Sequence, residues 1–342
     1  MIEPKSNSYL IAQEEAEAFL LNAYKNDSLH NSYIFAGPKG IGKATLAYKF
    51  ARFLLSGGKK DAASLDISPT SPIYKQIESG AHPDFKVLKK SYNKTDTAKI
   101  IKAINSGKPL SAEELQEFKK SSVIKIDEVR TINEFLMKSS ALGGYRIVIV
   151  DSIDDMNQNA ANAILKTLEE PPLKTILILI SHNINSLLPT IKSRCAKLFL
   201  KPLEENQVAS LLRRYIPTME EKNIKALATL SPQSIGKAID YADFNVVKQN
   251  EMLQNIVYAK NNFMLKDLIT LANELSKTEE TFTFGFEIIT NFLKENAHGF
   301  ENVDTLSDLY FEANQIYNQT LSLNLDKKQA IIKIVTKIAQ NI

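Results

Sequence analysis

Four residues near the start of the chain have the types and spacing of a phosphate-binding loop. Glycines stand at Gly37, Gly40 and Gly42, and Lys43 follows directly. Glycines let backbone N–H groups converge on phosphate oxygens, and a lysine amino group reaches the terminal phosphates of a nucleotide. Only 12 glycines occur in the chain. We therefore expect these four residues to bind nucleotide phosphates, and we take an ordinary glycine turn as the alternative.

The position after the loop lysine lacks the group that normally holds a magnesium ion. A Ser or Thr hydroxyl is needed there, but the chain has Ala44. Thr45 comes one place later and would point elsewhere on the helix. The phosphate cradle is therefore predicted without its metal ligand.

A second acidic position follows the apolar run 146–150. Asp151 comes first, where an Asp orients Mg²⁺ in nucleotide hydrolases of this type, and Ser152 stands where a Glu would polarise water. A serine hydroxyl is not basic at neutral pH and does not serve as a general base without help. Asp154 and Asp155 follow, and we expect them to cap the next helix, with catalysis as the alternative. The site is predicted to bind nucleotide weakly or not at all, and not to cleave it.

The elements that must position these residues alternate between strand and helix. Helical periodicity is seen at 14–23 and 44–55, and apolar β-type runs occupy 32–36, 84–88, 145–150, 175–180 and 196–200. Strands that alternate with helices predict a doubly wound α/β domain, with a parallel five-stranded sheet and helices on both faces. Beyond residue 202 the pattern is amphipathic helix, which predicts a small helical domain at 202–243 and a larger one at 246–342.

Composition limits the classes of function. The chain has 42 Lys+Arg and 39 Asp+Glu, a net charge of +3, which is too balanced for a surface that binds DNA or membrane throughout. The apolar runs are far shorter than the roughly 20 residues that span a bilayer. The single cysteine forms no internal disulfide, and no secretory signal is apparent. We expect a cytoplasmic protein with no membrane contact.

One segment, 86–125, is unusually rich in lysine. It contains ten lysines and four acidic residues, while Gly107 and Pro109 interrupt any regular pattern. The segment has no arginine and few aromatic side chains that could stack on bases. We expect a solvated, partly mobile insertion, and keep a DNA-binding patch as the alternative.

Longer stretches of the sequence resemble a known family. The run NQNAANAILKTLEEPP at 157–172 and the run LPTIKSRC at 188–195 are similar to bacterial clamp-loader subunits of DNA polymerase III, which are AAA+ ATPases. The resemblance extends back through 123–130 and 79–84 to the phosphate loop. It implies an AAA+ nucleotide-binding-like domain at 1–201, a helical lid at 202–243 and a helical collar that serves oligomerisation at 246–342.

Three positions separate two types within that family. The hydrolysing gamma/tau type needs the magnesium hydroxyl and the water-activating carboxylate, and Ala44 and Ser152 replace them. The hydrolysing type also carries a sensor arginine at the start of a lid helix, where Gly236 stands here. All three positions favour the delta-prime type, which has the same fold and little or no hydrolysis.

The motif that contains Arg194 is intact, unlike the three positions above. In the family, the arginine of the Ser193–Cys195 motif reaches across a subunit interface and stabilises charge on the γ-phosphate of the neighbour's nucleotide. The resemblance therefore implies that Arg194 is a catalytic arginine finger in trans. We expect Cys195 to fill a small buried space.

The chain departs from the family at its zinc module. Many relatives carry four cysteines before the His-Pro-Asp segment, and three of those positions align with Ser68, Ser71 and Tyr74. None of these is a thiolate, so we expect no zinc and a loop shaped by packing alone. His82 has no companion ligands and is interpreted as a turn residue.

The resemblance implies a non-hydrolysing structural member of a hetero-pentameric clamp-loader ring. Its partners would be gamma/tau and delta subunits, and through the ring the sliding clamp and primer-template DNA. The alternative is a gamma/tau-type ATPase with an atypical magnesium site, in which Thr45 or a water replaces the missing hydroxyl and Asp154 aligns the nucleophile. A P-loop kinase is more distant, because the last third of the chain is helical.

Overall fold

The chain forms two compact units, Met1–Leu203 and Glu204–Ile342. The computed structural model describes residues 3–92, 94–106, 118, 121, 123–231, 233–259, 264–296 and 303–341. Each unit is described by itself. Within these described residues, no helix has the length and apolar character needed to cross a bilayer.

The first unit is built on a five-stranded sheet with the order β2-β3-β4-β1-β5. All neighbouring strands are parallel, which confirms the predicted sheet. The strands are β1 (Ser32–Ala36), β2 (Phe85–Lys89), β3 (Arg146–Asp151), β4 (Thr175–Ser181) and β5 (Ala196–Phe199). Because the strands are parallel, their carboxyl ends meet at one edge of the sheet. The loop after β1 and the residues that follow β3 and β4 therefore lie at the same edge.

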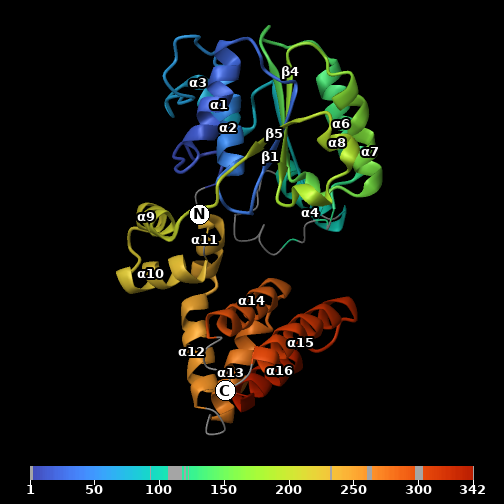
Figure 1. Ribbon diagram of the computed structural model, residues 1–342. Helices are drawn as coiled ribbons and strands as arrows, with labels where there is room; N and C mark the ends of the chain where they lie inside the picture. The colour runs from blue at the N-terminus through green and yellow to red at the C-terminus, as the bar shows by residue number, and fades with distance from the viewer. Residues whose placement is uncertain are drawn as a thin grey trace. The chain divides into compact units, whose positions relative to one another are not determined.

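Helices cover both faces of this sheet, as Figure 1 shows. One face carries α1 (Glu14–Lys25), α2 (Lys43–Leu55) and α3 (Pro72–Ser79), and the other carries α6 (Ile126–Met137), α7 (Gln158–Glu169) and α8 (Pro189–Lys192). The strands feed two separate cores because successive side chains point to opposite faces. In β1, Tyr33 and Phe35 enter one core, while Ile34 and Ala36 enter the other. Both faces are buried, which explains why the strand sequences are continuously apolar.

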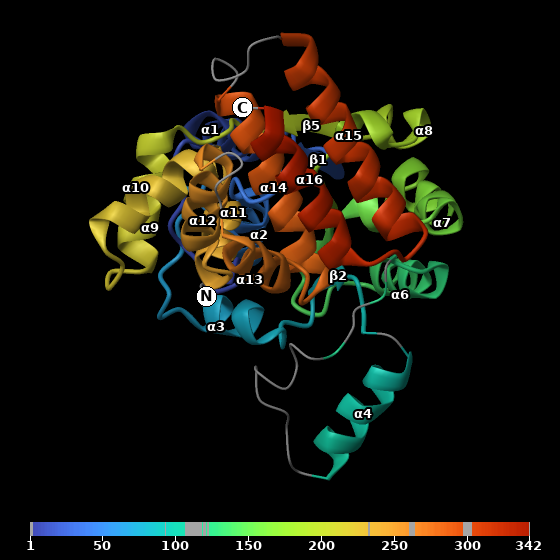
Figure 2. The ribbon, with the colours of Figure 1, turned by 90° about the horizontal axis from the view of Figure 1, so that it is seen from below.

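The lysine-rich segment begins within β2, and a helix follows among its described residues. Helix α4 spans Lys94–Asn105, and Figure 2 shows it apart from α6 and α7. The helix ends before the breaks at Gly107 and Pro109, and the solvated insertion with its DNA-binding alternative stays a prediction. Residues 107–117 lie outside the described residues.

The second unit is helical throughout its described residues, as predicted. Its helices are α9 (Glu205–Tyr215), α10 (Glu221–Leu230), α11 (Ile235–Asp243), α12 (Val246–Tyr258), α13 (Leu265–Leu275), α14 (Glu279–Glu295), α15 (Val303–Ser322) and α16 (Lys327–Asn341). Helices α11 and α14 are joined where the Tyr241 hydroxyl donates to Glu287 Oε2 at 2.6 Å and Lys237 forms an ion pair with the same oxygen at 3.0 Å. The division of this unit into a lid and a collar stays a prediction.

Candidate functional site

The phosphate loop has a backbone that requires its glycines. Gly37, Gly40 and Gly42 have φ angles of 145°, 81° and 102°, in the left-handed region that disfavours other residues. A Cβ on Gly37 would lie 2.8 Å from Ile41 Cδ1, and one on Gly42 would lie 2.5 Å from Leu10 Cδ1. The loop therefore has both the conformation and the close packing that only glycine permits. Its backbone N–H groups and the start of α2 form an anion-binding geometry.

Lys43 begins α2 and turns back into this loop. Its side chain is buried, with the residue only 2% exposed, and Nζ donates to the carbonyl oxygens of Gly37 at 2.6 Å and of Pro38. Burial lowers the pKa of Lys43 to about 8, and the nearby charges of Asp154 and Asp151 oppose this shift. The amino group thus lies at the centre of the loop, where a bound anion would replace carbonyl oxygens as its partner.

Asp151 ends β3 at the same edge of the sheet. Its carboxylate lies 3.9 Å from Lys89 Nζ and close enough to Lys43 to act on the pKa of that lysine. Of the two carboxylates that metal-assisted hydrolysis requires, this is the one that the chain retains. Asp151 could hold a cation together with nucleotide phosphates.

Ser152 is bonded within the turn that follows β3. The side chain is buried, and Oγ donates to Asp155 Oδ2 at 3.0 Å. Asp155 in turn accepts from Lys90 Nζ at 3.0 Å. The pair fixes the turn after β3, so the position that would polarise water in a hydrolase serves the fold here.

The expectation that Asp154 caps the next helix is wrong. Its carboxylate accepts from Ser181 Oγ at 3.0 Å and from the backbone N–H groups of His182 at 2.6 Å and Asn183 at 3.1 Å. Helix α7 is capped instead by Asn157, whose Oδ1 accepts from Ala160 N at 2.9 Å. Asp154 therefore ties the end of β4 to the end of β3.

His182 is a neighbour of the site that sequence reasoning missed. It follows β4, and its Nδ1 is buried and without a hydrogen-bond partner in the part of the chain that the structure describes. Burial and then the charge of Lys43 lower the pKa of His182, so its imidazole is neutral at pH 7. A polar residue directly after a fully buried strand was the available signal. The neutral ring adds an uncharged acceptor beside Lys43.

Thr45 does not supply the missing magnesium hydroxyl from its own position. It lies one residue beyond Ala44 on α2, which rotates its side chain by about 100° around the helix axis. Its side chain is also buried. The site as built therefore has a phosphate loop, a lysine and one strand-end aspartate.

Arg194 lies outside this cluster, directly after α8. Its Nη1 donates to the Thr190 carbonyl oxygen at 2.8 Å, and its Nη2 forms an ion pair with Glu169 Oε1 at 2.8 Å. The side chain of Arg194 is 34% exposed, so the guanidinium is held at the surface. Cys195 is buried in the adjacent core, as predicted, and burial raises the pKa of its thiol to about 12. Arg194 is thus the accessible member of this motif and Cys195 is a packing residue.

The positions that align with zinc ligands are used for capping and packing. Ser71 Oγ accepts from Tyr74 N at 3.2 Å at the start of α3, and the Tyr74 hydroxyl donates to the Ser6 carbonyl at 2.9 Å. The Arg52 guanidinium lies 3.9 Å from the Tyr74 ring centroid. Ser68 Oγ lies 2.7 Å from Thr70 Oγ1. These contacts give the loop a shape that rests on packing.

His82 and Gly236 also have ordinary structural positions. His82 is buried, and its Nδ1 accepts from Asp84 N at 3.2 Å across a turn. Among the described residues, no group of three or more His, Cys, Asp or Glu could hold a metal ion. Gly236 lies in the first turn of α11, in the second unit.

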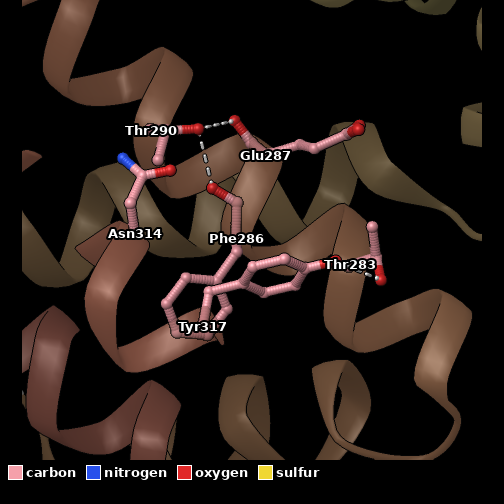
Figure 3. A pocket seen from close by; sticks show the side chains of 6 residues that line it. All are labelled: Thr283, Phe286, Glu287, Thr290, Asn314 and Tyr317. Carbon is pink, nitrogen blue, oxygen red and sulfur yellow. Dashed lines mark hydrogen bonds between the residues drawn. The ribbon is translucent and has the colours of Figure 1, made fainter. Parts of the chain in front are cut away.

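The second unit contains a cavity of about 140 Å³ between α14 and α15, drawn in Figure 3. The polar side chains around it already have partners. The Thr290 hydroxyl donates to the Phe286 carbonyl at 2.8 Å, and Thr283 Oγ1 lies 3.1 Å from the Tyr317 hydroxyl. Glu287 is engaged by α11, and Asn314 donates to a backbone carbonyl of its own helix. We therefore place the candidate site at the phosphate loop.

A parallel sheet with a phosphate loop after β1, followed by a helical unit, is the AAA+ architecture. A solved gamma subunit-related protein of Thermotoga maritima shares it, with a TM-score of 0.50, 17% identity and 94% of this chain and 99% of that chain covered. Residues 12–204 match the family model described as "DNA polymerase III, delta subunit". The chain belongs to this family.

Curated relatives agree with the family. The chain is 35% identical over 167 residues to DNA polymerase III subunit delta' of Pseudomonas aeruginosa, which covers 49% of this chain and 42% of that protein. It is 26% identical to subunit delta' of Bacillus subtilis over 94% of this chain and 80% of that protein. Subunit tau/gamma of Haemophilus influenzae is 25% identical over 77% of this chain and 34% of that protein. The predicted resemblance to a clamp-loader subunit of the delta-prime type is confirmed.

Proposed function

We propose that this chain is the non-hydrolysing member of a clamp-loader ring and supplies Arg194 in trans to a neighbouring ATPase subunit. The ring would contain gamma/tau and delta subunits, would act in the cytoplasm, and would place a sliding clamp on primer-template DNA. The observation that carries the proposal is an exposed, ordered Arg194 in a chain whose own nucleotide site lacks two catalytic groups. The chain would position Arg194 within the ring and would not hydrolyse ATP itself.

The residues of the nucleotide site support the proposal that this chain does not hydrolyse ATP. The phosphate cradle is retained in Gly37, Gly40, Gly42 and Lys43. Asp151 remains beside it as a residue that could hold a cation. The positions for the metal hydroxyl and the water-activating carboxylate are filled by alanine and by a serine that bonds within its own turn. Binding of ATP would therefore be weak or absent, and hydrolysis would need groups that the site does not present.

The alternative, a gamma/tau-type ATPase, would need Asp154 to align the attacking water. Its two oxygens already accept three hydrogen bonds from the end of β4, and turning Oδ1 toward water would leave the buried Ser181 hydroxyl without this acceptor. The intact phosphate loop is the observation that keeps this second function open. The two proposals differ in whether the isolated chain turns over ATP.

The test compares ATP hydrolysis by the purified chain, by the reconstituted ring and by a ring that contains Arg194→Ala. The proposal expects no Mg²⁺-dependent turnover by the chain alone and slowed DNA-stimulated hydrolysis in the R194A ring. Robust turnover by the isolated chain would favour the gamma/tau-type function. Unchanged hydrolysis in the R194A ring would remove the role in trans.

A further inference from the structure

Glu169 and Arg194 come from different elements and meet at the surface of the first unit. Glu169 is the last residue of α7, and Arg194 follows α8, which packs beside α7 in Figure 1. Glu169 Oε1 lies 2.8 Å from Arg194 Nη2, with the two side chains 50% and 34% exposed. The contact joins residues that are 25 positions apart in the sequence, and nothing in the local sequence pattern requires it.

Glu169 lies at the end of α7, a helix position that disfavours negative charge. The carboxyl end of a helix carries a partial negative charge, so an acidic side chain in the last turn is unfavourable unless a cation compensates it. Lys166 lies in the same last turn, and Arg194 is the cation that forms an ion pair with Glu169. The acidic residue at the end of α7 is therefore compensated from outside its own helix as well.

The guanidinium is held at two points. Arg194 Nη1 donates a hydrogen bond to the Thr190 carbonyl oxygen, and Nη2 forms an ion pair with the Glu169 carboxylate. A guanidinium has five N–H donors in one plane, so two fixed contacts orient the plane and leave other donors for a phosphate. Without Glu169, only the carbonyl and Ser193 Oγ, at 3.4 Å, would remain as partners of Nη1.

We propose that Glu169 is a positioning residue for Arg194: it presets the guanidinium plane before the neighbouring nucleotide arrives. This inference rests on the proposed role of Arg194 in trans. Glu169 touches neither nucleotide nor reacting atoms, and acts only through Arg194. The Arg194 side chain then loses part of its conformational entropy in the free subunit, before hydrolysis begins.

The test uses single-turnover ATP hydrolysis by the reconstituted ring. The kinetic phase that is lost in the R194A ring reports ATP hydrolysis at the neighbouring subunit's nucleotide site. Glu169→Ala is expected to slow that phase by about two- to fivefold, or about 0.4–1 kcal/mol at 1.36 kcal/mol per tenfold, the range of an exposed ion pair. Glu169→Gln keeps an oxygen acceptor and is expected to fall between E169A and the wild type.

A double-mutant cycle distinguishes positioning from a structural role. Adding E169A to R194A is expected to leave the residual rate of R194A unchanged. Glu221→Ala is a matched control, because Glu221 pairs with Arg213 at 2.6 Å on the surface of the second unit with similar exposure. It should leave the phase unchanged.

The outcomes separate the inference from the proposed function. An unchanged or faster phase in E169A, with R194A still slow, overturns the inference alone. A further loss on adding E169A to R194A also overturns it, because Glu169 would then act independently. If R194A removes no phase, both the role in trans and the inference fail.

Discussion

Replacement of Lys43 by methionine should reveal the cost of keeping a charged amine inside the phosphate loop. Lys43 Nζ is buried against loop carbonyls, and burial lowers its pKa from the ordinary 10.5 to about 8. In the unfolded chain the lysine regains its ordinary pKa. Between pH 8 and pH 10.5 the unfolded state therefore binds a proton that the folded state has released.

The sign of the effect follows from this difference. Stability rises with pH wherever the unfolded state binds more protons. Lys43 should therefore make the wild type gain stability relative to Lys43→Met above pH 8, by about 1.36 kcal/mol per pH unit. From pH 8 to pH 9.5 the gain is about 2 kcal/mol. Below pH 8 the difference between the two proteins should be constant.

The measurement is the free energy of unfolding in urea, followed by far-UV circular dichroism, for both proteins between pH 7 and pH 9.5. The absolute difference also contains the hydrogen bonds from Lys43 to the loop carbonyls, so only the change with pH is diagnostic. Lys60→Met is a control, because Lys60 is an exposed lysine in the same unit. A difference between wild type and K43M that does not vary with pH would refute the buried-charge reasoning.

Three further predictions concern stability. Gly42→Ala should lower the free energy of unfolding by about 1–3 kcal/mol, because of its φ of 102° and its Cβ contact with Leu10, and L10A should restore only part of the loss in urea denaturation. Leu65→Ala should cost about 2–5 kcal/mol, because Leu65 is fully buried in the core of the first unit. The prediction that the first unit binds no zinc also implies that a chelator leaves the melting temperature of the wild type unchanged. Asp154→Asn should cost about 1–3 kcal/mol and speed amide exchange of His182, whereas D154N with wild-type exchange and stability would contradict the tie between β3 and β4.

Much of the fold could be predicted because its strands are buried on both faces. The predicted runs at 32–36 and 175–180 correspond to β1 (Ser32–Ala36) and β4 (Thr175–Ser181). Short runs that are rich in aromatic or β-branched residues favour strands, and a helix would need a longer run with a different period. The glycine spacing was equally informative, because positive φ angles and close packing leave few other residues acceptable.

The roles of single polar side chains were less predictable. Asp154 is near the start of α7 in sequence, so capping was the local expectation, yet its partners lie at Ser181 to Asn183. The order of the strands places the ends of β3 and β4 side by side and gives Asp154 three donors from the end of β4. His182 was missed for the same reason, since its importance comes from its neighbours.

Residue type and local spacing are enough to predict the class of fold, the phosphate loop, and the absence of a hydroxyl after Lys43 and of a carboxylate after Asp151. The lowered pKa of Lys43 and the pairing of Arg194 with Glu169 could be found only in the folded chain. Burial and ion pairing depend on which elements pack together, and parallel strands with crossover helices bring together residues that are far apart in the chain.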